Sequence, residues 1–211
     1  MTPSNPSERI LVTGGAGFIG SRLCLALRSR QPDVRVVALD NLRRRGSELQ
    51  VPRLQAAGVE FVPGDVRNME DLERAGACDV IVDAAAETSV LAGVAEDPGY
   101  VVGSNLIGSI NCLELARKTG AGFILLSSSR VYPIEGLRAI ELRRVGDRFE
   151  VVDAEQVRGV TARGVTERFP MDGLRTLYGA TKYAAELLAQ EFFHMYGIRG
   201  VIDRCGVVAG P

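Results

Sequence analysis

The sequence predicts an α/β fold built on a doubly wound, parallel β-sheet. Short apolar runs alternate along the chain with helical patterns, and the segments that link them are short until residue 133. This alternation favours parallel strands joined by crossover helices, because each helix carries the chain back to the start of the next strand. We expect one Rossmann-type domain over residues 1–211, with residues 133–177 as a long insertion near the ligand-binding edge of the sheet.

Composition places the chain among globular proteins with a sizeable core. Of its 211 residues, 46% are hydrophobic and 24% are charged, and the net charge is -1. This balance argues against nucleic acid or an anionic membrane as the main partner, since both require a basic surface. No apolar run is long enough to span a bilayer, and Met1–Ser7 lacks the pattern of a signal peptide. We therefore predict a cytoplasmic protein.

The cysteines are spread widely along the chain. Each of the four lies within or beside an apolar run: Cys24, Cys78, Cys112 and Cys205. This spacing favours buried thiols over disulfides or a metal site. We predict no bound metal.

A glycine-rich stretch follows the first apolar run. Residues 10–12 lead into Thr13-Gly14-Gly15-Ala16-Gly17-Phe18-Ile19-Gly20, and a helical pattern continues to Arg30. Glycines at these spacings allow a sharp turn, a close approach of backbone N–H groups to a pyrophosphate and tight packing of helix on strand, and a helix N-terminus attracts phosphate. An ordinary strand–helix turn is the alternative. A dinucleotide site would use Gly14, Gly17, Phe18, Ile19 and Gly20.

The second apolar run ends in Asp40, twenty residues after Gly20. An acid at this distance is placed to accept hydrogen bonds from the ribose hydroxyls of a dinucleotide, which strengthens the dinucleotide interpretation. Its charge would repel the 2′-phosphate of NADP, so we predict NAD as the cofactor, with Asp40 and Asn41 among its contacts. The arginines at positions 43–45 either hold a phosphate or, as we favour, face water or the adenine edge.

Two further runs predict strands that complete the cofactor edge. Residues 59–64 lead to Asp65, which is placed to meet the adenine ring; a helix N-cap for residues 69–75 is an equal alternative. Residues 80–86 predict a fourth strand, whose small residues would let the cofactor pass close to the backbone, although they also suit plain packing. The contacts predicted here are Asp65, Val66, Ala84, Ala85 and Ala86.

An apolar stripe predicts a helix from about residue 97 to residue 119. Asn105 interrupts the buried side of this stripe. Because a buried amide needs partners, Asn105 either bonds a neighbouring loop or helps to fix the catalytic region, and we count it among the cofactor contacts. The fifth strand, at residues 123–126, leads into Ser127-Ser128-Ser129, at the sheet edge where open α/β sheets bind ligands.

The segment at residues 133–177 breaks the alternation. One alternating run, at residues 148–152, predicts a hairpin strand. A connection of this length inside a domain is usually functional or partly mobile, which makes this segment a candidate lid or a candidate substrate-contacting loop. A helix then runs from Tyr178 to Gly197, and a sixth strand covers residues 200–204. We expect His194, near the end of that helix, to serve the helix dipole or face solvent.

Tyr178-x-x-x-Lys182 opens this last helix. Residues four apart lie on one helix face, so the ammonium can lower the pKa of the phenol and also grip a ribose. Lysine supplies only two of the 25 basic residues, which argues against Lys182 as an ordinary solvent-exposed surface residue. Tyr178 is then a candidate base, and Ser128 can hold a substrate hydroxyl through a hydrogen bond. The alternative is a packed tyrosine with a solvated lysine. The candidate catalytic residues are Ser128, Tyr178 and Lys182, of which the last two also contact the cofactor.

Taken together, these motifs resemble the extended short-chain dehydrogenase/reductase superfamily, specifically its NAD-dependent nucleotide-sugar epimerases and dehydratases. The resemblance covers nearly the whole chain and is carried, in order, by Thr13–Gly20, Asp40–Leu42, Gly64–Val66, Asn105–Gly108, Ser127–Ser129 and Tyr178-x-x-x-Lys182. Ser129-Arg130-Val131-Tyr132-Pro133, the long insertion and Leu177–Lys182 are most similar to the CDP-paratose 2-epimerase (CDP-tyvelose epimerase) branch.

The resemblance implies a tightly held NAD, a CDP- or UDP-linked hexose as substrate and a homodimer. Hydride would leave a sugar carbon, generate a ketone and return to the other face, while Tyr178 takes and returns the hydroxyl proton. Three positions depart from the family pattern, since Asp83 and Glu87 stand where relatives often carry His and Gln, and Pro133 replaces a glycine.

Family members continue past the Gly-Pro at residues 210–211, and that part normally supplies the last strands and most of the sugar pocket. We therefore expect the C-terminal substrate region to be truncated or absent here. On this expectation the chain alone binds cofactor but does not epimerise a nucleotide sugar.

Two other functions stay open. A sugar-nucleotide dehydratase or reductase would use the same scaffold, but dehydration enlists an added acid and base near the tyrosine. The nearest acid pair, Glu167 and Asp172, does not clearly form that arrangement. A non-catalytic NAD-binding module is the alternative from another class, and retained cofactor without turnover would indicate it.

Overall fold

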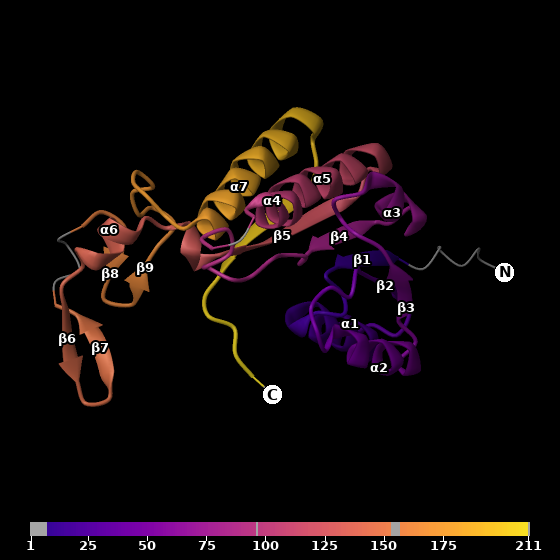
Figure 1. Cartoon of the computed structure of the whole chain (residues 1–211), viewed down its shortest axis with the longest axis horizontal. Helices are drawn as coiled ribbons and strands as arrows, with labels where there is room; N and C mark the ends of the chain where they lie inside the picture. The colour runs from indigo at the N-terminus through magenta and orange to yellow at the C-terminus, as the bar shows by residue number, and fades with distance from the viewer. Residues whose placement is uncertain (1–7, 96, 153–156, 211) are drawn as a thin grey trace.

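The computed structural model describes residues 8–95, 97–152 and 157–210. Within them, six parallel strands form one sheet in the order β10-β5-β4-β1-β2-β3 (Figure 1). The order reverses between β1 and β4, the point at which open parallel sheets bind ligands. This topology confirms the predicted doubly wound α/β fold. The strands are β1 (Arg9–Thr13), β2 (Arg35–Asp40), β3 (Glu60–Pro63), β4 (Val80–Asp83), β5 (Gly122–Ser128) and β10 (Gly200–Cys205).

Helices cover both faces of this sheet (Figure 1). On one face lie α1 (Phe18–Arg30) and α2 (Val51–Ala56), which follows the short 3-10 turn η1 (Ser47–Gln50). On the other face lie α3 (Met69–Arg74), α5 (Gly108–Thr119) and α7 (Leu177–Tyr196). Each face therefore has its own buried apolar cluster, and the central strands read as nearly continuous apolar runs because they are covered on both sides.

The helix predicted from about residue 97 changes its winding part-way. It begins as α4 (Gly99–Val102), widens into the π turn η2 (Gly103–Ile107) and continues as α5. Asn105 lies fully buried in this π turn. Turns of this kind are frequent at functional sites because they let one side chain leave the regular helical ladder.

The inserted segment forms a small lobe beside the sheet (Figure 1). It contains α6 (Ile134–Arg138), a hairpin of β6 (Leu142–Val145) and β7 (Arg148–Val151), and a second pair of β8 (Val160–Thr161) and β9 (Gly164–Val165). The predicted hairpin strand is thus confirmed. The lobe packs around its own buried cluster, which consists of Val131, Tyr132, Val160 and Phe169.

Thiols and the single histidine lie largely where the sequence predicts. Cys24, Cys78 and Cys112 are buried and unpaired, but Cys205 is only half-buried because β10 is an edge strand. His194 is exposed in the last turn of α7. Across residues 8–95, 97–152 and 157–210, no helix combines the length and apolar character of a bilayer span. The same ranges hold no converging set of three or more metal-ligating side chains.

Candidate cofactor-binding and active site

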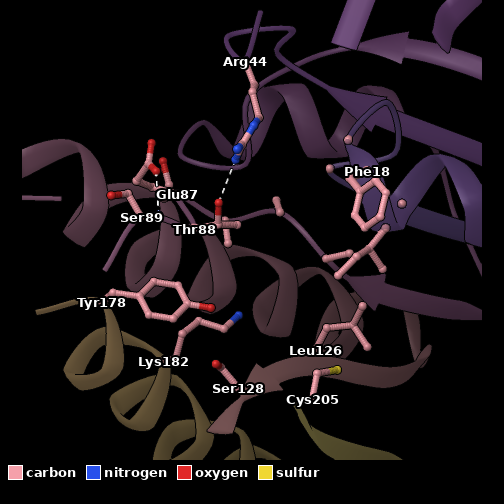
Figure 2. Close-up of a pocket in the computed structure, with 18 of the residues that line it drawn as sticks. Phe18, Arg44, Glu87, Thr88, Ser89, Leu126, Ser128, Tyr178, Lys182 and Cys205 are labelled. Atoms are coloured by element: carbon pink, nitrogen blue, oxygen red, sulfur yellow. Dashed lines mark hydrogen bonds between the residues drawn. The ribbon is translucent and has the colours of Figure 1, made fainter. Parts of the chain in front are cut away.

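A cleft of about 1090 Å³ opens at the carboxyl ends of β1, β2, β4 and β5 (Figure 2). This volume is slightly above the usual range for small-molecule sites, which suits a long ligand. Most of the residues predicted to bind cofactor or catalyse line it, namely Gly14, Gly17, Phe18, Ile19, Gly20, Asp40, Asn41, Val66, Ala84, Ala85, Ala86, Ser128, Tyr178 and Lys182. The other two, Asp65 and Asn105, do not line it.

The glycine turn between β1 and α1 leaves no room for side chains. Gly14 has a φ of +62°, and a Cβ on Gly20 would lie 2.1 Å from the carbonyl oxygen of Gly14. Gly17 is the N-cap of α1 and contributes no side-chain cap, so the first amides of the helix have no side-chain partner there. Unpaired amides at a helix N-terminus favour an anion, so the amides at this end of the cleft are suited to a phosphate.

Asp40 supports this turn from behind. One carboxylate oxygen, Oδ2, accepts a hydrogen bond from the Ala16 N–H at 3.0 Å, and the other, Oδ1, accepts from the Leu42 N–H at 2.8 Å. Burial raises the pKa of Asp40, and these backbone donors oppose the rise. Each carboxylate oxygen has a second lone pair, so Asp40 can hold the turn and still accept a ligand hydroxyl. The sequence prediction did not include this structural role.

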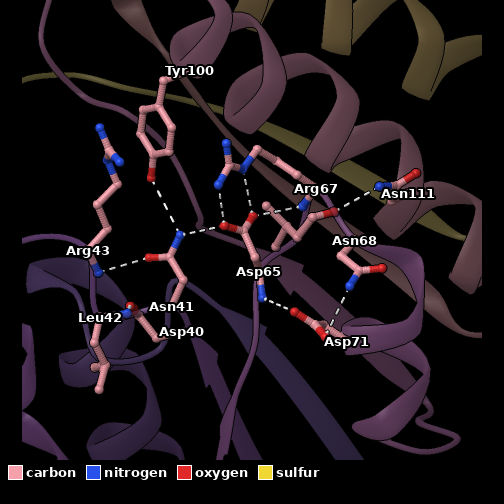
Figure 3. A network of polar contacts seen from close by, with 11 residues as sticks. Asp40, Asn41, Leu42, Arg43, Asp65, Arg67, Asn68, Asp71, Tyr100 and Asn111 are labelled. Carbon is pink, nitrogen blue, oxygen red and sulfur yellow. Dashed lines mark hydrogen bonds and ion pairs between the residues drawn. The ribbon is translucent and has the colours of Figure 1, made fainter.

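A polar network borders the cleft beyond Asp40 (Figure 3). Asn41 donates from Nδ2 to Asp65 at 2.9 Å, and Arg67 donates from Nε and Nη2 to the two oxygens of Asp65 at 2.9 and 2.7 Å. The Arg67 guanidinium lowers the pKa of Asp65 to about 2. Asp65 therefore acts as an anchor that orients Asn41.

The N-cap alternative for Asp65 is wrong. The side chain that caps α3 is Asn68, whose Oδ1 accepts from the Glu70 N–H at 3.2 Å. Asp65 lies three residues earlier and its carboxylate is occupied by Arg67, so it is out of reach of the helix amides.

The arginines after Asn41 contact other loops. The Arg43 guanidinium stacks on the Tyr100 ring at 3.8 Å from the ring centroid. Arg44 donates from Nη1 to Thr88 Oγ1 at 2.7 Å, which joins the loop after β2 to the loop after β4 (Figure 2). Thr88 was missed at the sequence level because no local pattern marks it.

Asn105 bonds a neighbouring loop, which confirms the first of the two alternatives predicted for it, and it also contacts the helix of the candidate base. Its Oδ1 accepts from the Glu87 N–H at 2.8 Å and its Nδ2 donates to the Glu87 carbonyl at 3.0 Å, so it fixes the loop after β4. The same Nδ2 lies 3.3 Å from Thr181 Oγ1, next to Lys182 on α7. The π turn thus connects the loop after β4 to α7, the helix that carries the candidate base.

Three candidate catalytic side chains face one part of the cleft (Figure 2). Ser128 is the last residue of β5, and its Oγ accepts from the Arg130 N–H at 3.1 Å. Tyr178 and Lys182 lie one turn apart at the start of α7, which Thr176 caps by accepting from the Gly179 N–H at 3.2 Å. Figure 2 shows the hydroxyls of Tyr178 and Ser128 and the Lys182 amine pointing toward the same region.

Lys182 is 1% exposed, so the solvated-lysine alternative is wrong. Its Nζ has no hydrogen-bond partner among the described residues. Burial lowers the pKa of Lys182, and the charge of Asp83 opposes this effect. An unpaired buried amine that lines the cleft, together with the glycine turn, fits the hydroxyl groups and phosphates of a dinucleotide.

The insertion contributes a second cavity beside the first. It measures about 440 Å³ and shares Val90, Ser129, Arg130 and Gly206 with the large cleft. The inserted lobe supplies part of its wall through Ile134, Leu137, Val165, Glu167 and Thr176. The length of the insertion, directly after the serine-rich strand end, was the sequence signal for this contact.

Comparison with known proteins identifies the family to which the chain belongs. Residues 10–211 match the NAD dependent epimerase/dehydratase family. The chain belongs to this family. Membership confirms the predicted superfamily, and it confirms NAD as the predicted cofactor.

Relatives within the family include both reaction types in its name. The chain is 30% identical over 204 residues to dTDP-glucose 4,6-dehydratase of Mycobacterium tuberculosis, covering 96% of this chain and 54% of that protein. It is 27% identical over 205 residues to CDP-paratose 2-epimerase of Salmonella typhi, covering 93% and 56%. Its fold matches the UDP-glucose 4-epimerase of Thermus thermophilus in complex with NAD with a TM-score of 0.67 and 32% identity, covering 93% and 54%. The chain spans about half the length of the curated relatives it matches.

Proposed function

We propose that this chain is the cofactor-binding and proton-transferring part of an NAD-dependent nucleotide-sugar epimerase. The observation that supports this most strongly is the convergence of Ser128, Tyr178 and the unpaired Lys182 amine on one part of a cleft shaped for a dinucleotide. Such a cluster can hold a hydroxyl, remove its proton and stabilise the resulting charge.

Each catalytic residue has a separate role in the proposal. Ser128 donates or accepts the hydrogen bond that orients the sugar hydroxyl, and Tyr178 takes its proton. Lys182 stabilises the phenolate by its charge and donates to the nicotinamide ribose. Bound NAD would supply a hydride acceptor that later becomes the donor. The sugar carbon passes through a ketone, and return of hydride to its other face inverts the centre.

The cofactor contacts are part of the same proposal. The turn residues Gly14 and Gly17 and the amides of Phe18–Gly20 hold the pyrophosphate. Asp40 and Asn41 hold the adenosine ribose, with Asp65 anchoring Asn41 beside Val66 at the adenine edge. Ala84–Ala86 let the cofactor pass close to the backbone, and Asn105 supports that loop from behind.

The carboxylates around the cleft favour epimerisation over dehydration. Among the described residues that line it, the acids are Asp40 and Glu87. Asp40 holds backbone amides, and Glu87 Oε1 accepts from the Ser89 N–H at 2.9 Å. Glu167 lines the neighbouring cavity, and Asp172 lines neither. With Asp40 committed to the glycine turn, the described lining offers at most one side chain, Glu87, for the two added groups, an acid and a base, that a dehydration enlists.

We further propose a CDP- or UDP-linked hexose as substrate, handled in the manner of CDP-paratose 2-epimerase. Support comes from the similarity to the Salmonella typhi enzyme and from the inserted lobe, whose cavity adjoins Ser129 and Arg130. The apolar side chains of Ile134, Leu137 and Val165 in that cavity suit the less polar faces of a sugar ring.

The test is to incubate the chain with NAD and a panel of CDP-, UDP- and dTDP-hexoses and to follow epimer formation by NMR. In whichever form of the protein turns over, Tyr178→Phe should lower the rate at least about a hundredfold and leave NAD affinity nearly unchanged. Tyr183→Phe is the matched control, because this tyrosine is on the same helix but outside the cleft lining. Full activity in Tyr178→Phe would refute the assigned base.

Other products would redirect the proposal. A keto-deoxy sugar would indicate a dehydratase. Because the chain alone is expected to bind NAD without epimerising, an NAD-binding module is indicated only if a form extended to the length of the relatives also retains NAD without turnover on any sugar.

We also propose a homodimer through the outer surface of α7. Apolar side chains project there, with Leu187 48% and Met195 66% exposed. Exposed apolar patches of this kind commonly mark subunit contacts. Sedimentation velocity should show a dimer that Leu187→Asp converts to a monomer, whereas Leu49→Asp, on the 3-10 turn η1, should not. A monomer in the wild-type chain would contradict this part of the proposal.

A further inference from the structure

Two opposite charges are buried beneath the cleft on different elements. Lys182 on α7 and Asp83 at the end of β4 are each 1% exposed. A buried ammonium without a hydrogen bond is unfavourable, because it has lost its water and gained no partner. Something close to Lys182 must therefore offset its charge if it is to stay protonated.

The groups that act on Lys182 come from four elements. They are Asp83 from β4, Cys112 from α5, Cys205 from β10 and Glu186 from α7 itself. Burial raises the pKa of both thiols, so Cys112 and Cys205 are neutral near pH 7.

Glu186 is already neutralised by another residue. Arg204 donates from Nε and Nη2 to its carboxylate at 2.7–3.1 Å, and Ser127 donates its hydroxyl to the same group. The Arg204 side chain in turn lies against Tyr132, with Nη1 3.3 Å from the phenol oxygen. Because the Glu186–Arg204 pair carries no net charge, it offsets little of the charge on Lys182.

Asp83 is the remaining carboxyl group of this set, and its described hydrogen-bond partners are neutral. Its Oδ1 accepts from Thr13 Oγ1 at 2.8 Å and its Oδ2 accepts from Ser109 Oγ at 2.6 Å. Both donors are neutral hydroxyls, and hydrogen bonds of this kind stabilise the carboxylate without cancelling its charge. No cation contacts Asp83 among the described ion pairs.

The same hydroxyls hold Asp83 in place relative to the cleft. Thr13 Oγ1 also accepts from the Ala84 and Ala85 N–H groups at 3.2 Å each, at the start of the loop that lines the cleft. On the other side, Ser109 Oγ lies 3.1 Å from the Asn105 carbonyl, and Asn105 reaches Thr181, the neighbour of Lys182. A continuous hydrogen-bonded path therefore joins Asp83 to the segment that carries Lys182.

We propose that Asp83 is a positioning residue that supplies the buried counter-charge of Lys182 and keeps its amine protonated before the cofactor binds. Its importance for turnover rests on the role proposed above for Lys182. An amine kept protonated can donate to a ribose hydroxyl as soon as the dinucleotide enters. The same positive charge stabilises the phenolate of Tyr178.

The chain offers a direct measurement because it contains only two lysines, Lys118 and Lys182. Chain labelled with ¹³C-lysine and freed of bound dinucleotide gives one side-chain signal set for each, and Lys118 is a surface reference paired with Glu73 at 3.1 Å. Titration followed by NMR should show the midpoint of Lys182 at least about one pH unit lower in Asp83→Asn than in the wild type. The midpoint of Lys118 should not move.

Ser109→Ala is the matched control, because it removes one donor to Asp83 and retains the charge. It should shift the Lys182 midpoint by less than half as much as Asp83→Asn. Equal midpoints in Asp83→Asn and the wild type would overturn the proposal, as would an equal shift in the two variants.

A second variant covers the case in which Asp83→Asn does not fold. Adding Lys182→Gln removes the unpaired buried charge, so the double variant should fold where the single variant does not. Failure of both would show that Asp83 matters through its hydroxyl contacts and not its charge, and would overturn the proposal. None of these readouts requires cofactor or turnover, so their outcome is separate from that of the proposed function.

Discussion

The glycine turn at residues 14–20 and the inserted lobe at residues 133–176 both border the binding region, but they are held together differently. In the turn, backbone meets backbone: Gly15 N–H donates to the Leu39 carbonyl at 3.0 Å and Gly17 N–H to the Gly14 carbonyl at 2.9 Å. The lobe has backbone bonds of its own, such as Thr166 N–H to the Gly159 carbonyl at 2.8 Å, but its buried centre is made of side chains. One example is the edge-to-face contact of Tyr132, the residue just before the lobe, with Phe169 at 5.8 Å between ring centroids.

This difference predicts how each region responds to change. A turn of this kind has one workable geometry, because a Cβ added at Gly14, Gly17 or Gly20 would lie within 3.0 Å of another main-chain atom. A small side-chain cluster can repack, because flexible groups shift at modest cost. The turn should therefore control cofactor binding, while the lobe varies without disturbing it. Four experiments test this contrast, in order of decreasing expected effect.

Gly20→Ala should have the largest effect. Its Cβ would lie 2.1 Å from the Gly14 carbonyl oxygen, so the turn must open. We expect a loss of about 1–3 kcal/mol of stability and NAD binding weaker by up to about a hundredfold, measured by calorimetry. The control is Gly136→Ala in the lobe, where the nearest atoms belong to the Phe169 ring at 3.1 Å. Similar losses of stability and NAD affinity in both variants would contradict the proposed difference between the turn and the lobe.

Cofactor choice should depend on one carboxylate at the turn. On the proposed role of Asp40, its carboxylate would repel a 2′-phosphate and would accept from a 2′-hydroxyl. NAD should then bind at least about tenfold better than NADP, on the order of 1.4 kcal/mol. Asp40→Asn should reduce the preference for NAD over NADP. It should also lower the affinity for both cofactors, since Asp40 accepts a hydrogen bond from the Ala16 amide in the turn. Asp33→Asn, at an exposed position, is the control. Equal or tighter binding of NADP by the wild type would assign residues 43–45 to the 2′-phosphate.

Loss of the lobe's central aromatic should leave the turn untouched. Phe169 is 3% exposed, and Phe169→Ala removes the largest contact of the lobe cluster. Hydrogen exchange should rise across the described parts of residues 133–176, while NAD affinity changes by less than about twofold. Phe149→Ala, at a side chain 72% exposed, should change neither. A marked fall in NAD affinity in Phe169→Ala would show that the lobe supports the cofactor site.

The smallest effect concerns acid stability beside the turn. The pKa of Asp65 is lowered to about 2 by Arg67, below the value of about 3.9 expected in the unfolded chain. The ion pair therefore stabilises the fold above about pH 4, and this contribution disappears as the pH falls through about 2. The pair is partly exposed, so we expect less than about 1 kcal/mol. In Asp65→Asn, the free energy of unfolding should fall by that much less between about pH 4 and pH 2 than in the wild type. An unchanged dependence on pH would contradict this prediction.

Much of the framework is determined by local sequence alone. The strands, the glycine turn and the Tyr178–Lys182 pair were predicted because periodicity, glycine spacing and i,i+4 geometry act over a few residues. Ser128 followed from its place at a strand end. Even the hairpin strand near residue 148 is marked by local alternation.

Only the tertiary structure decided how these parts are held. Asn41 meets Asp65 across 24 residues of sequence, Arg44 meets Thr88 across 44, and Thr13 meets Asp83 across 70. Such contacts arise when the sheet brings strand ends together, and no local pattern encodes them. The choice of Asn68 as the cap of α3 and the burial of Lys182 belong to the same class, because each depends on which competing group folding places nearest.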